Sequence, residues 1–383
     1  MFSSRLPASL GPNALAVAID RLRTSGASFI DLTVTNPTAA GIAYPAHLLS
    51  GLASSAGLTY TPEPFGMRPA REAVAREASR LGATVSSDRV VLTSSTSEAY
   101  ALLFKLLCDS GDEVLIPQPS YPLFDLLSRL EDVRAVPYRL LEHSRWSIDR
   151  AGVERALTPR TRAVLVVSPN NPTGSITTEE DARWLSTLCA ARGIAVISDE
   201  VFADYRFTSH SNGEMARFPD SMSFHLGGLS KSAGLPQVKL GWIVADGPEA
   251  LVAAALERLE LICDTYLSVS TPVQVAAPSL IEGGVAVRAA IQERIGRNLS
   301  TLKKLVAGRD DVSLREPEAG WSAVLQVPAT DSEEEMVLRL LSDRGVLVHP
   351  GYFFDFSREA FLVVSLLPEE SVFADGVARV LAR

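Results

Sequence analysis

Residues 162–199, RAVLVVSPNNPTGSITTEEDARWLSTLCAARGIAVISD, contain the pattern that decides the fold. Two runs rich in β-branched residues, Arg162–Val167 and Ile194–Ser198, lie on either side of an amphipathic stretch, Glu179–Arg192. Because both runs are almost continuously apolar, they predict strands buried on both faces, as in a parallel sheet covered by helices. Such sheets bind ligands at the carboxyl ends of their strands. The residues there are polar: SPNNPTG follows the first run and Asp199 follows the second.

The same alternation extends from about residue 88 to residue 245. Further apolar runs predict strands at Arg89–Leu92, Glu113–Ile116, Ser221–Leu226 and Lys239–Val244. Helices are expected at Ser97–Leu107 and Tyr121–Leu130. This region therefore predicts one α/β unit with a largely parallel sheet between two layers of helices.

The pattern changes after about residue 270. A long helical stretch through Val285–Leu305 precedes short strands and a closing helix. The strands are expected near Ala323–Val327, Val346–His349 and Phe361–Leu366, and the helix at Glu370–Leu381. Because 383 residues exceed what one hydrophobic core usually supports, we expect two connected domains. We place a large domain at residues 41–275, a small α+β domain at 276–383, and an N-terminal segment joining the small domain at 1–40.

Composition argues against several classes of function. The net charge is −9 and no long basic run occurs, so binding to nucleic acid is not expected. No stretch has the apolar length of a membrane span, and residues 1–22 lack the pattern of a secretory signal, so we expect a cytoplasmic protein. Cys108, Cys189 and Cys263 are odd in number and far apart, which indicates buried thiols rather than a disulfide framework. Neither they nor the five histidines show the spacing of metal ligands, so no metal is expected.

Two nucleotide-binding motifs are also missing. No G-x-G-x-x-G follows a predicted strand, and residues 225–232 lack the glycines of a P-loop.

Three polar residues stand out at predicted strand ends. Lys231 lies in a loop of small residues, where it is either simply exposed or reactive. Asp199 ends a buried strand, where an unpaired carboxylate would be costly, so we expect it to cap a helix, pair with a cation or keep a ring nitrogen protonated. Asn171 either shapes its Asn-Pro turn or directs its amide at a ligand oxygen.

A hydroxyl-rich turn, Thr93–Ser97, joins a predicted strand to a helix. Free N–H groups and the helix dipole at Ser95, Thr96 and Ser97 would suit a phosphate. Ordinary N-capping explains one hydroxyl, whereas a run of hydroxyls favours an anion site. Tyr121, in PSYPLF, either packs in the core or stacks on a flat ring.

Together these segments resemble the class I/II aminotransferases, the fold-type I group of pyridoxal-phosphate enzymes. The likeness rests on YTPEPFGMRPAREAVA, TSSTSEA, PSYPLF, SPNNPTG, SDEVFADY and LSKSAGLPQVKLGW, in the family's order and over nearly the whole chain. One such motif would be weak, but six in order are specific. The resemblance implies an α/β fold: a large domain with a mainly parallel seven-stranded sheet covered by helices, and a smaller α+β domain.

The resemblance also implies a role for each candidate. Lys231 would form a Schiff base with pyridoxal 5'-phosphate and then move the substrate proton between Cα and the cofactor. Asp199 would pair with the ring nitrogen, Asn171 would bond the phenolic oxygen, and Tyr121 would stack on the ring.

The phosphate would be held by several groups. These are Ser95, Thr96, Ser97 and Lys239, together with Tyr60 from the neighbouring subunit. A homodimer with shared active sites is therefore implied.

The chain departs from the family pattern on the cofactor side at three positions. Phe202 stands where a tyrosine usually bonds the phenolic oxygen, although Tyr205 is close by. Gly228 replaces a serine, and Lys239 replaces a phosphate-binding arginine without its bidentate fork.

The substrate side departs further. Val363 occupies the place of an arginine that clamps the substrate carboxylate, and Thr35-Asn36-Pro37 replaces a glycine-bearing turn. A hydrogen bond to a charged group contributes about 1.5–3 kcal/mol, on the order of 10–100-fold in affinity. Either another arginine takes over the clamp or the substrate differs. The candidates are Arg206, Arg315 and Arg358.

Three functions are therefore considered. The first is a pyridoxal-phosphate-dependent aminotransferase that transfers an amino group between an amino acid and a keto acid through Lys231. The second keeps the cofactor but is a lyase, decarboxylase or cyclase acting on a modified amino acid, as Val363 and Phe202 suggest. The third is a non-catalytic ligand-binding protein, against which the joint presence of Lys231, Asp199 and Asn171 argues.

Overall fold

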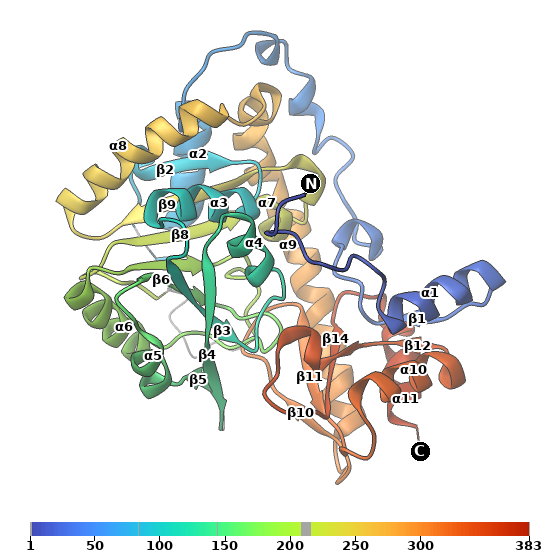
Figure 1. Cartoon of the computed structure of the whole chain (residues 1–383). Coiled ribbons are helices and arrows are strands. Elements are labelled where there is room, and N and C mark those ends of the chain that lie inside the picture. Colours follow the sequence, from blue (N-terminus) through green and yellow to red (C-terminus); the bar gives the residue numbers. More distant parts are fainter. Residues whose placement is uncertain (1, 83, 144, 208–215, 383) are drawn as a thin grey trace.

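A computed structural model describes residues 2–82, 84–143, 145–207 and 216–382 (Figure 1). Within them the central sheet has eight strands, in the order β2-β9-β8-β7-β6-β3-β4-β5. Their bounds are β2 Val90–Thr93, β3 Glu113–Gln118, β4 Arg134–Glu142, β5 Trp146–Ile148, β6 Thr161–Val167, β7 Ala195–Asp199, β8 Ser223–Gly228 and β9 Gly241–Asp246. Neighbours from β8 to β4 are parallel, β9 is antiparallel to β2 and β8, and β5 is antiparallel to β4. The mainly parallel sheet is confirmed, with one strand more than the seven expected.

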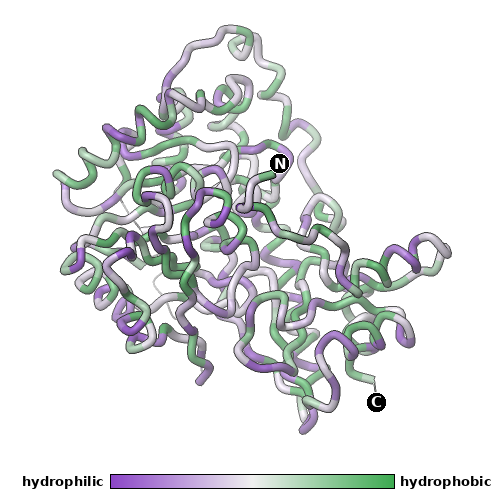
Figure 2. Tube along the Cα trace, viewed as in Figure 1, coloured by the Kyte–Doolittle hydropathy of each residue, from purple (hydrophilic) through white to green (hydrophobic). Residues whose placement is uncertain are grey.

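Helices cover both faces of this sheet (Figure 1). One face packs against α3 (Thr96–Leu107), α4 (Phe124–Leu130) and α8 (Glu249–Tyr266), and the other against α5 (Arg150–Ala156) and α6 (Glu179–Arg192). In Figure 2 the tube of α6 carries both hydrophilic and hydrophobic residues, and its buried positions between Asp181 and Cys189 recur with helical spacing, so one face lies in the core. Strand residues alternate between faces, so Asp199 lies on the face of Ala195 and Ile197, which is the face that α3 covers.

Two strands of the central sheet escaped prediction for identifiable reasons. β4 lies next to the edge of the sheet and contains Pro137 and two exposed arginines, so it lacks a continuous apolar run. β5 is only three residues long.

β9 begins later than predicted because Lys239 has a left-handed backbone, with φ 59°, which no strand accommodates.

The small domain contains a four-stranded antiparallel sheet in the order β10-β11-β14-β13. Its strands are β10 Ser313–Arg315, β11 Ser322–Gln326, β13 His349–Pro350 and β14 Phe361–Ser365, with helices α10 Glu333–Arg344 and α11 Glu370–Leu381. After α1 (Ala14–Ser25), β1 (Ile30–Asp31) pairs in parallel with β12 (Val346–Leu347). The N-terminal segment therefore lies against the small domain.

The helix α9, Thr271–Val306, connects the two parts of the molecule (Figure 1). It starts well before the predicted Val285 and continues through Pro278. It packs against α2 (Arg68–Ser79) at one end and α11 at the other. Because one core cluster includes residues of α2, α9, α10 and α11, the helix fixes how the two sheets face each other.

The remaining elements are short. They are α7 Leu229–Ser232 and the 3₁₀ helices η1 Pro37–Ala39, η2 Ser50–Ala53, η3 Ser55–Leu58, η4 Ser87–Arg89, η5 Pro236–Val238 and η6 Gly351–Phe354. None of the helices in the described ranges has the length and apolar character needed to cross a membrane. Cys189 and Cys263 are buried and Cys108 is half-buried, all as free thiols.

Candidate active site

A cavity of about 360 Å³ lies where the carboxyl ends of β6, β7 and β8 face the small domain. Both domains supply its walls. The predicted site residues that line it are Ser95, Thr96, Ser97, Tyr121, Asn171, Asp199 and Lys231. Residues spread over more than a hundred positions of sequence thus meet at one point, as expected for the strand ends of a parallel sheet.

Asp199 is the buried acid of this cavity, with only 7% of its surface exposed. The Tyr100 hydroxyl donates a 2.7 Å hydrogen bond to its Oδ2 atom, and the Val201 N–H donates to Oδ1 at 3.2 Å. Burial raises the pKa of Asp199, and the two hydrogen bonds oppose that rise. A carboxylate in this position gains from any cation that enters the cavity.

Tyr100 was not predicted as a site residue. It lies one turn into α3, and its contact with Asp199 arises only because α3 packs over the end of β7. A buried tyrosine needs a hydrogen-bond partner, which is the only hint that the sequence gives.

Lys231 lies in α7, directly after β8. Its ammonium is 5.1 Å from the centre of the Trp321 ring and 5.7 Å from that of Phe202. Burial lowers the pKa of Lys231, although the Asp199 carboxylate opposes this shift. A lowered pKa leaves more of the neutral amine, which is the nucleophilic form.

Tyr205 does not replace the hydroxyl that Phe202 lacks. Its hydroxyl donates a 2.6 Å hydrogen bond to the backbone carbonyl of Lys231. Tyr44 likewise donates to the carbonyl of Gly234, at 2.6 Å. Two tyrosines therefore hold the backbone of the lysine segment in place.

The turn predicted to bind a phosphate is the start of α3. Ser95 is the N-cap, and its hydroxyl accepts the Glu98 N–H at 3.1 Å, so ordinary capping accounts for this one side chain. Thr96 and Ser97 line the cavity beside it. A Cβ on Gly241 would lie 3.0 Å from the backbone of Ser95, so the glycine allows β9 to approach this turn closely.

The two asparagines of SPNNPTG have different positions. Asn170 is buried, donates its amide to Ser120 Oγ at 3.1 Å and accepts from Thr173 Oγ1 at 2.9 Å, so it shapes the turn. Asn171 lines the cavity instead. Tyr121 lines it too, with its ring edge-to-face against Phe124 at 5.7 Å between centres.

Two predicted phosphate ligands lie elsewhere. Lys239 is exposed and is not among the described residues that line the cavity. Tyr60 is 62% exposed on the loop after η3, which is the exposure needed by a residue that reaches another subunit. The roles of both residues remain predictions.

The small-domain wall offers no arginine among the described residues that line the cavity. Arg315 and Arg358 both pair with Glu142, at 2.5 and 2.7 Å. Arg206 donates to the carbonyl of Ala203 at 3.4 Å. None of these three candidate clamps is found in the wall, where Val363 lies beside aromatic and hydroxyl side chains.

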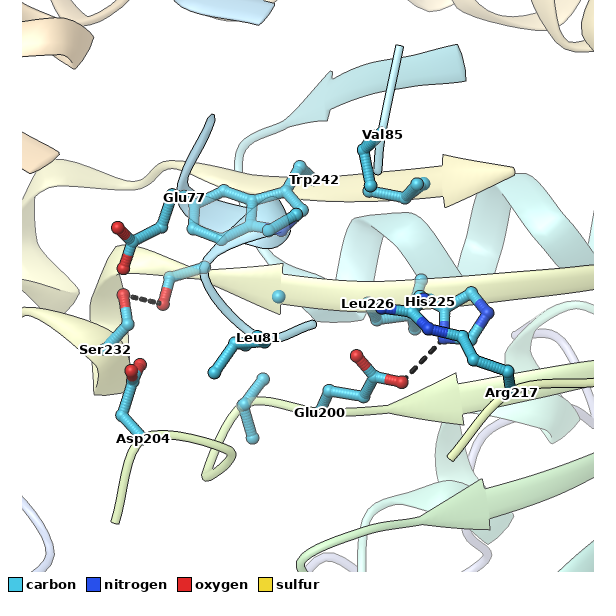
Figure 3. A pocket seen from close by; sticks show the side chains of 15 residues that line it. Glu77, Leu81, Val85, Glu200, Asp204, Arg217, His225, Leu226, Ser232 and Trp242 are labelled. Atoms are coloured by element: carbon cyan, nitrogen blue, oxygen red, sulfur yellow. Dashed lines mark hydrogen bonds and ion pairs between the residues drawn. The ribbon is translucent and has the colours of Figure 1, made fainter. Parts of the chain in front are cut away.

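Glu200 directly follows Asp199 in the sequence but faces a second, much smaller cavity (Figure 3). Figure 3 shows its carboxylate bonded to the His225 ring, with 2.6 Å between Oε1 and Nδ1. The Ser198 hydroxyl also donates to Oε1, at 3.0 Å. Of the two neighbouring acids, only Asp199 therefore faces the main cavity.

Comparison with known proteins matches this geometry. The family model described as aminotransferase class I and II matches residues 36–372. The glutamate-pyruvate aminotransferase AlaA of Haemophilus influenzae is 26% identical over 90% of this chain and 88% of its own length, and an alanine aminotransferase of Mycobacterium tuberculosis is 24% identical over 94% and 86%. The solved alanine aminotransferase of Pyrococcus furiosus superposes with a TM-score of 0.89 at 23% identity, covering 99% of this chain and 98% of its own. The chain belongs to the family of class I and II aminotransferases.

Proposed function

We propose that this chain is a pyridoxal-phosphate-dependent aminotransferase that moves an amino group between an amino donor and a carbonyl acceptor. Family membership supplies the reaction class. The observation that carries the cofactor assignment is that half-buried Lys231 and buried Asp199 face one cavity of cofactor size.

The lining residues fit the cofactor. When bound, pyridoxal phosphate supplies an aldehyde that takes up the amino group and a conjugated ring that accepts the electron pair released at the substrate carbon. Asp199 would hold a proton on the ring nitrogen, since a buried carboxylate gains from a cation beside it. Thr96 and Ser97, with the free N–H groups of α3, would bind the phosphate.

The remaining cofactor contacts would come from large-domain side chains. Asn171 would donate its amide to the phenolic oxygen, and Tyr121 would cover one face of the ring. Phe202 offers no hydroxyl, so one hydrogen bond to the phenolic oxygen is missing relative to the usual pattern. Lys239 would approach the phosphate only after its exposed side chain turns inward.

Lys231 would carry the chemistry at the substrate. Its neutral amine would hold the cofactor aldehyde and would accept and return the proton at the substrate carbon. Tyr205 holds the lysine backbone so that the amine returns to the same place after each exchange.

We also propose a homodimer in the cytoplasm. Leu58 and Tyr60 are 88% and 62% exposed. They lie at the end of η3, which packs against α9. Tyr266 and Leu267, shortly before the start of α9, are exposed as well. A second copy would cover this apolar surface and bring Tyr60 towards the neighbouring phosphate. The lyase, decarboxylase or cyclase alternative is not favoured, because the relatives named above are aminotransferases.

The Lys231→Ala variant tests the central assignment. It is expected to bind the cofactor through the phosphate but to lose the absorbance band of the lysine-bound form. Transfer of amino groups should fall on the order of 100- to 10,000-fold, the usual contribution of a positioned acid or base. Lys304→Ala, which changes an exposed lysine on α9, is the matched control and should behave like wild type. An unchanged absorbance band in Lys231→Ala would overturn the assignment.

A further inference from the structure

We propose that the amino substrate of this cavity is a primary amine whose reacting carbon carries a neutral hydrogen-bonding group, such as a hydroxymethyl or carboxamide, in place of a carboxylate, together with an apolar substituent. The inference rests on the proposed aminotransferase function and narrows its substrate class. Three properties of the small-domain wall support it: its charge, its apolar surface and the direction of its hydrogen bonds.

Within a single copy, the described residues of the cavity offer no cation to spare for a carboxylate. Lys231 is the one lysine among the described lining residues, no arginine joins it, and Lys231 is needed for the reaction itself. His349 also lines the wall, but burial lowers its pKa, so it is neutral at neutral pH. The residues outside the described ranges contain no lysine, and their only arginine is Arg383 at the end of the chain.

Part of the wall, around Val363, is apolar. Val363 packs in a cluster with Val324, Phe354 and Phe361 and is almost fully buried. Phe353 and Phe354 extend this surface into the cavity. A carboxylate here would lose its water without gaining a cationic partner, whereas an apolar or aromatic substituent would be stabilised by burial.

Two hydroxyls of the wall, those of Thr33 and Ser365, present acceptors, and Ser365 Oγ already accepts the Leu367 N–H at 3.2 Å. The Thr33 hydroxyl donates its proton to Asp31 Oδ1 at 2.6 Å, and the Ser365 hydroxyl donates to the Val34 carbonyl at 2.5 Å. Each hydroxyl has one proton, so the oxygen that faces the cavity can only accept. A carboxylate has no proton to donate, and two acceptors would repel it.

A neutral group that both donates and accepts fits this wall. Trp321 lines the cavity with 2% of its surface exposed, and its indole N–H has no hydrogen-bond partner among the described residues. A hydroxymethyl or carboxamide would donate to Thr33 or Ser365, and it would accept from Trp321 once the indole N–H, which is shielded from solvent, is uncovered. An unpaired buried N–H is costly, so such a contact would favour binding of this substrate class.

The reaction with such a substrate balances. The amine R–CH(NH₂)–R′ and the cofactor aldehyde become the carbonyl compound R–CO–R′ and the cofactor amine. The carbon that bears nitrogen is oxidised by two electrons, and the cofactor carbon is reduced by two. The proton that leaves the substrate carbon is transferred by Lys231.

Matched substrates on the wild-type holoenzyme test the inference. L-phenylalaninol, L-phenylalaninamide and L-phenylalanine share one side chain and differ in the group at issue, and single-turnover absorbance follows conversion of the cofactor to its amine form. The ratio of rate constant to dissociation constant should be on the order of 10- to 100-fold higher for the alcohol and the amide than for the acid. This factor corresponds to the free energy lost when a charged group has no hydrogen-bond partner. L-Alanine and L-glutamate, tested beside them, should also convert poorly.

The outcomes separate the two proposals. If the acids convert as fast as their neutral partners or faster, the substrate inference is wrong, and a cation from a second copy would account for it, while the aminotransferase function stands. If no amine and no amino acid converts the cofactor, the proposed function itself fails, and this inference with it.

Two variants sharpen the test. Val363→Arg should reverse the preference by raising conversion of L-phenylalanine at least about 10-fold. Because an arginine could disrupt the buried cluster, Thr33→Val provides an independent reading: it removes one acceptor while keeping the shape. Thr33→Val should reduce conversion of L-phenylalaninol and change that of 1-phenylethylamine, which lacks the hydroxymethyl group, much less. An equal effect on both amines would contradict the hydrogen-bond argument.

Discussion

Replacing Tyr100 by phenylalanine isolates the contact that supports Asp199. The Tyr100 hydroxyl, which extends from α3, donates a 2.7 Å hydrogen bond to the buried Asp199 carboxylate. A hydrogen bond to a charged group contributes about 1.5–3 kcal/mol. We therefore expect Tyr100→Phe to lower the free energy of unfolding of the cofactor-free protein by about that amount near pH 8.

The chain offers a matched control in Tyr138. Its hydroxyl is equally buried and donates to the backbone carbonyl of Leu165 at 2.9 Å, so it bonds a neutral acceptor. Tyr138→Phe removes the same atom and should cost only about 0.5–1.5 kcal/mol. The difference between the two variants measures the charge on Asp199.

The pH dependence gives a second criterion. Burial raises the pKa of Asp199 in the folded state, and the Tyr100 hydrogen bond counteracts part of that rise. The stabilisation by Tyr100 is therefore present while Asp199 is ionised and is lost as pH falls through its folded-state pKa. Urea unfolding at about pH 8 and about pH 5 should show a smaller cost of Tyr100→Phe at the lower pH, and an unchanged cost of Tyr138→Phe. Equal costs for the two variants at both pH values would refute the reasoning.

Two further predictions concern other buried groups. Burial lowers the pKa of His349, so the folded state binds this proton more weakly than the unfolded state, and stability is lost as pH falls below the ordinary histidine value. His349→Gln should therefore lose less stability than wild type between about pH 7.5 and pH 5.5 in urea unfolding, and an equal loss would count against this assignment. Burial raises the pKa of Cys108, Cys189 and Cys263 to about 12, which makes their thiolates roughly 1,000-fold rarer than that of a free cysteine. A thiol reagent such as Ellman's reagent should react slowly with the native protein. In urea, which unfolds the protein, it should react with all three thiols. A rapid reaction with the native protein would contradict the burial of the thiols.

Features with local signals could be predicted from sequence. The helix at Glu179–Arg192 has its predicted bounds because Thr178 caps its start and Gly193 ends it in a left-handed conformation. Asp199 and Lys231 were found because strand ends of a parallel sheet converge, so their meeting in one cavity needs no knowledge of loops.

Features that depend on tertiary contacts could not be predicted. Tyr100 and Tyr205 reach Asp199 and the Lys231 backbone across helix packing that has no signature in the chain. Arg315 and Arg358 were candidates for a clamp by residue type alone, and both are held by Glu142, on a strand that itself escaped prediction. The early start of α9 was hidden by Pro278, which the packed helix tolerates.

The two substrate-side departures from the family pattern, although more than three hundred residues apart, belong to one hydrogen-bonded unit. The Ser365 N–H donates to the carbonyl of Leu32 at 2.7 Å, and the Ser365 hydroxyl donates to the carbonyl of Val34. Thr35 follows directly on one side of this contact, and Val363 lies two residues before Ser365 on the same face of β14. A change at one position therefore alters the wall that the other completes. The cofactor side is built from β6, β7, β8 and the start of α3. Its chemistry can stay the same while substitutions in the hydrogen-bonded unit alter which substrate group binds beside the reacting carbon.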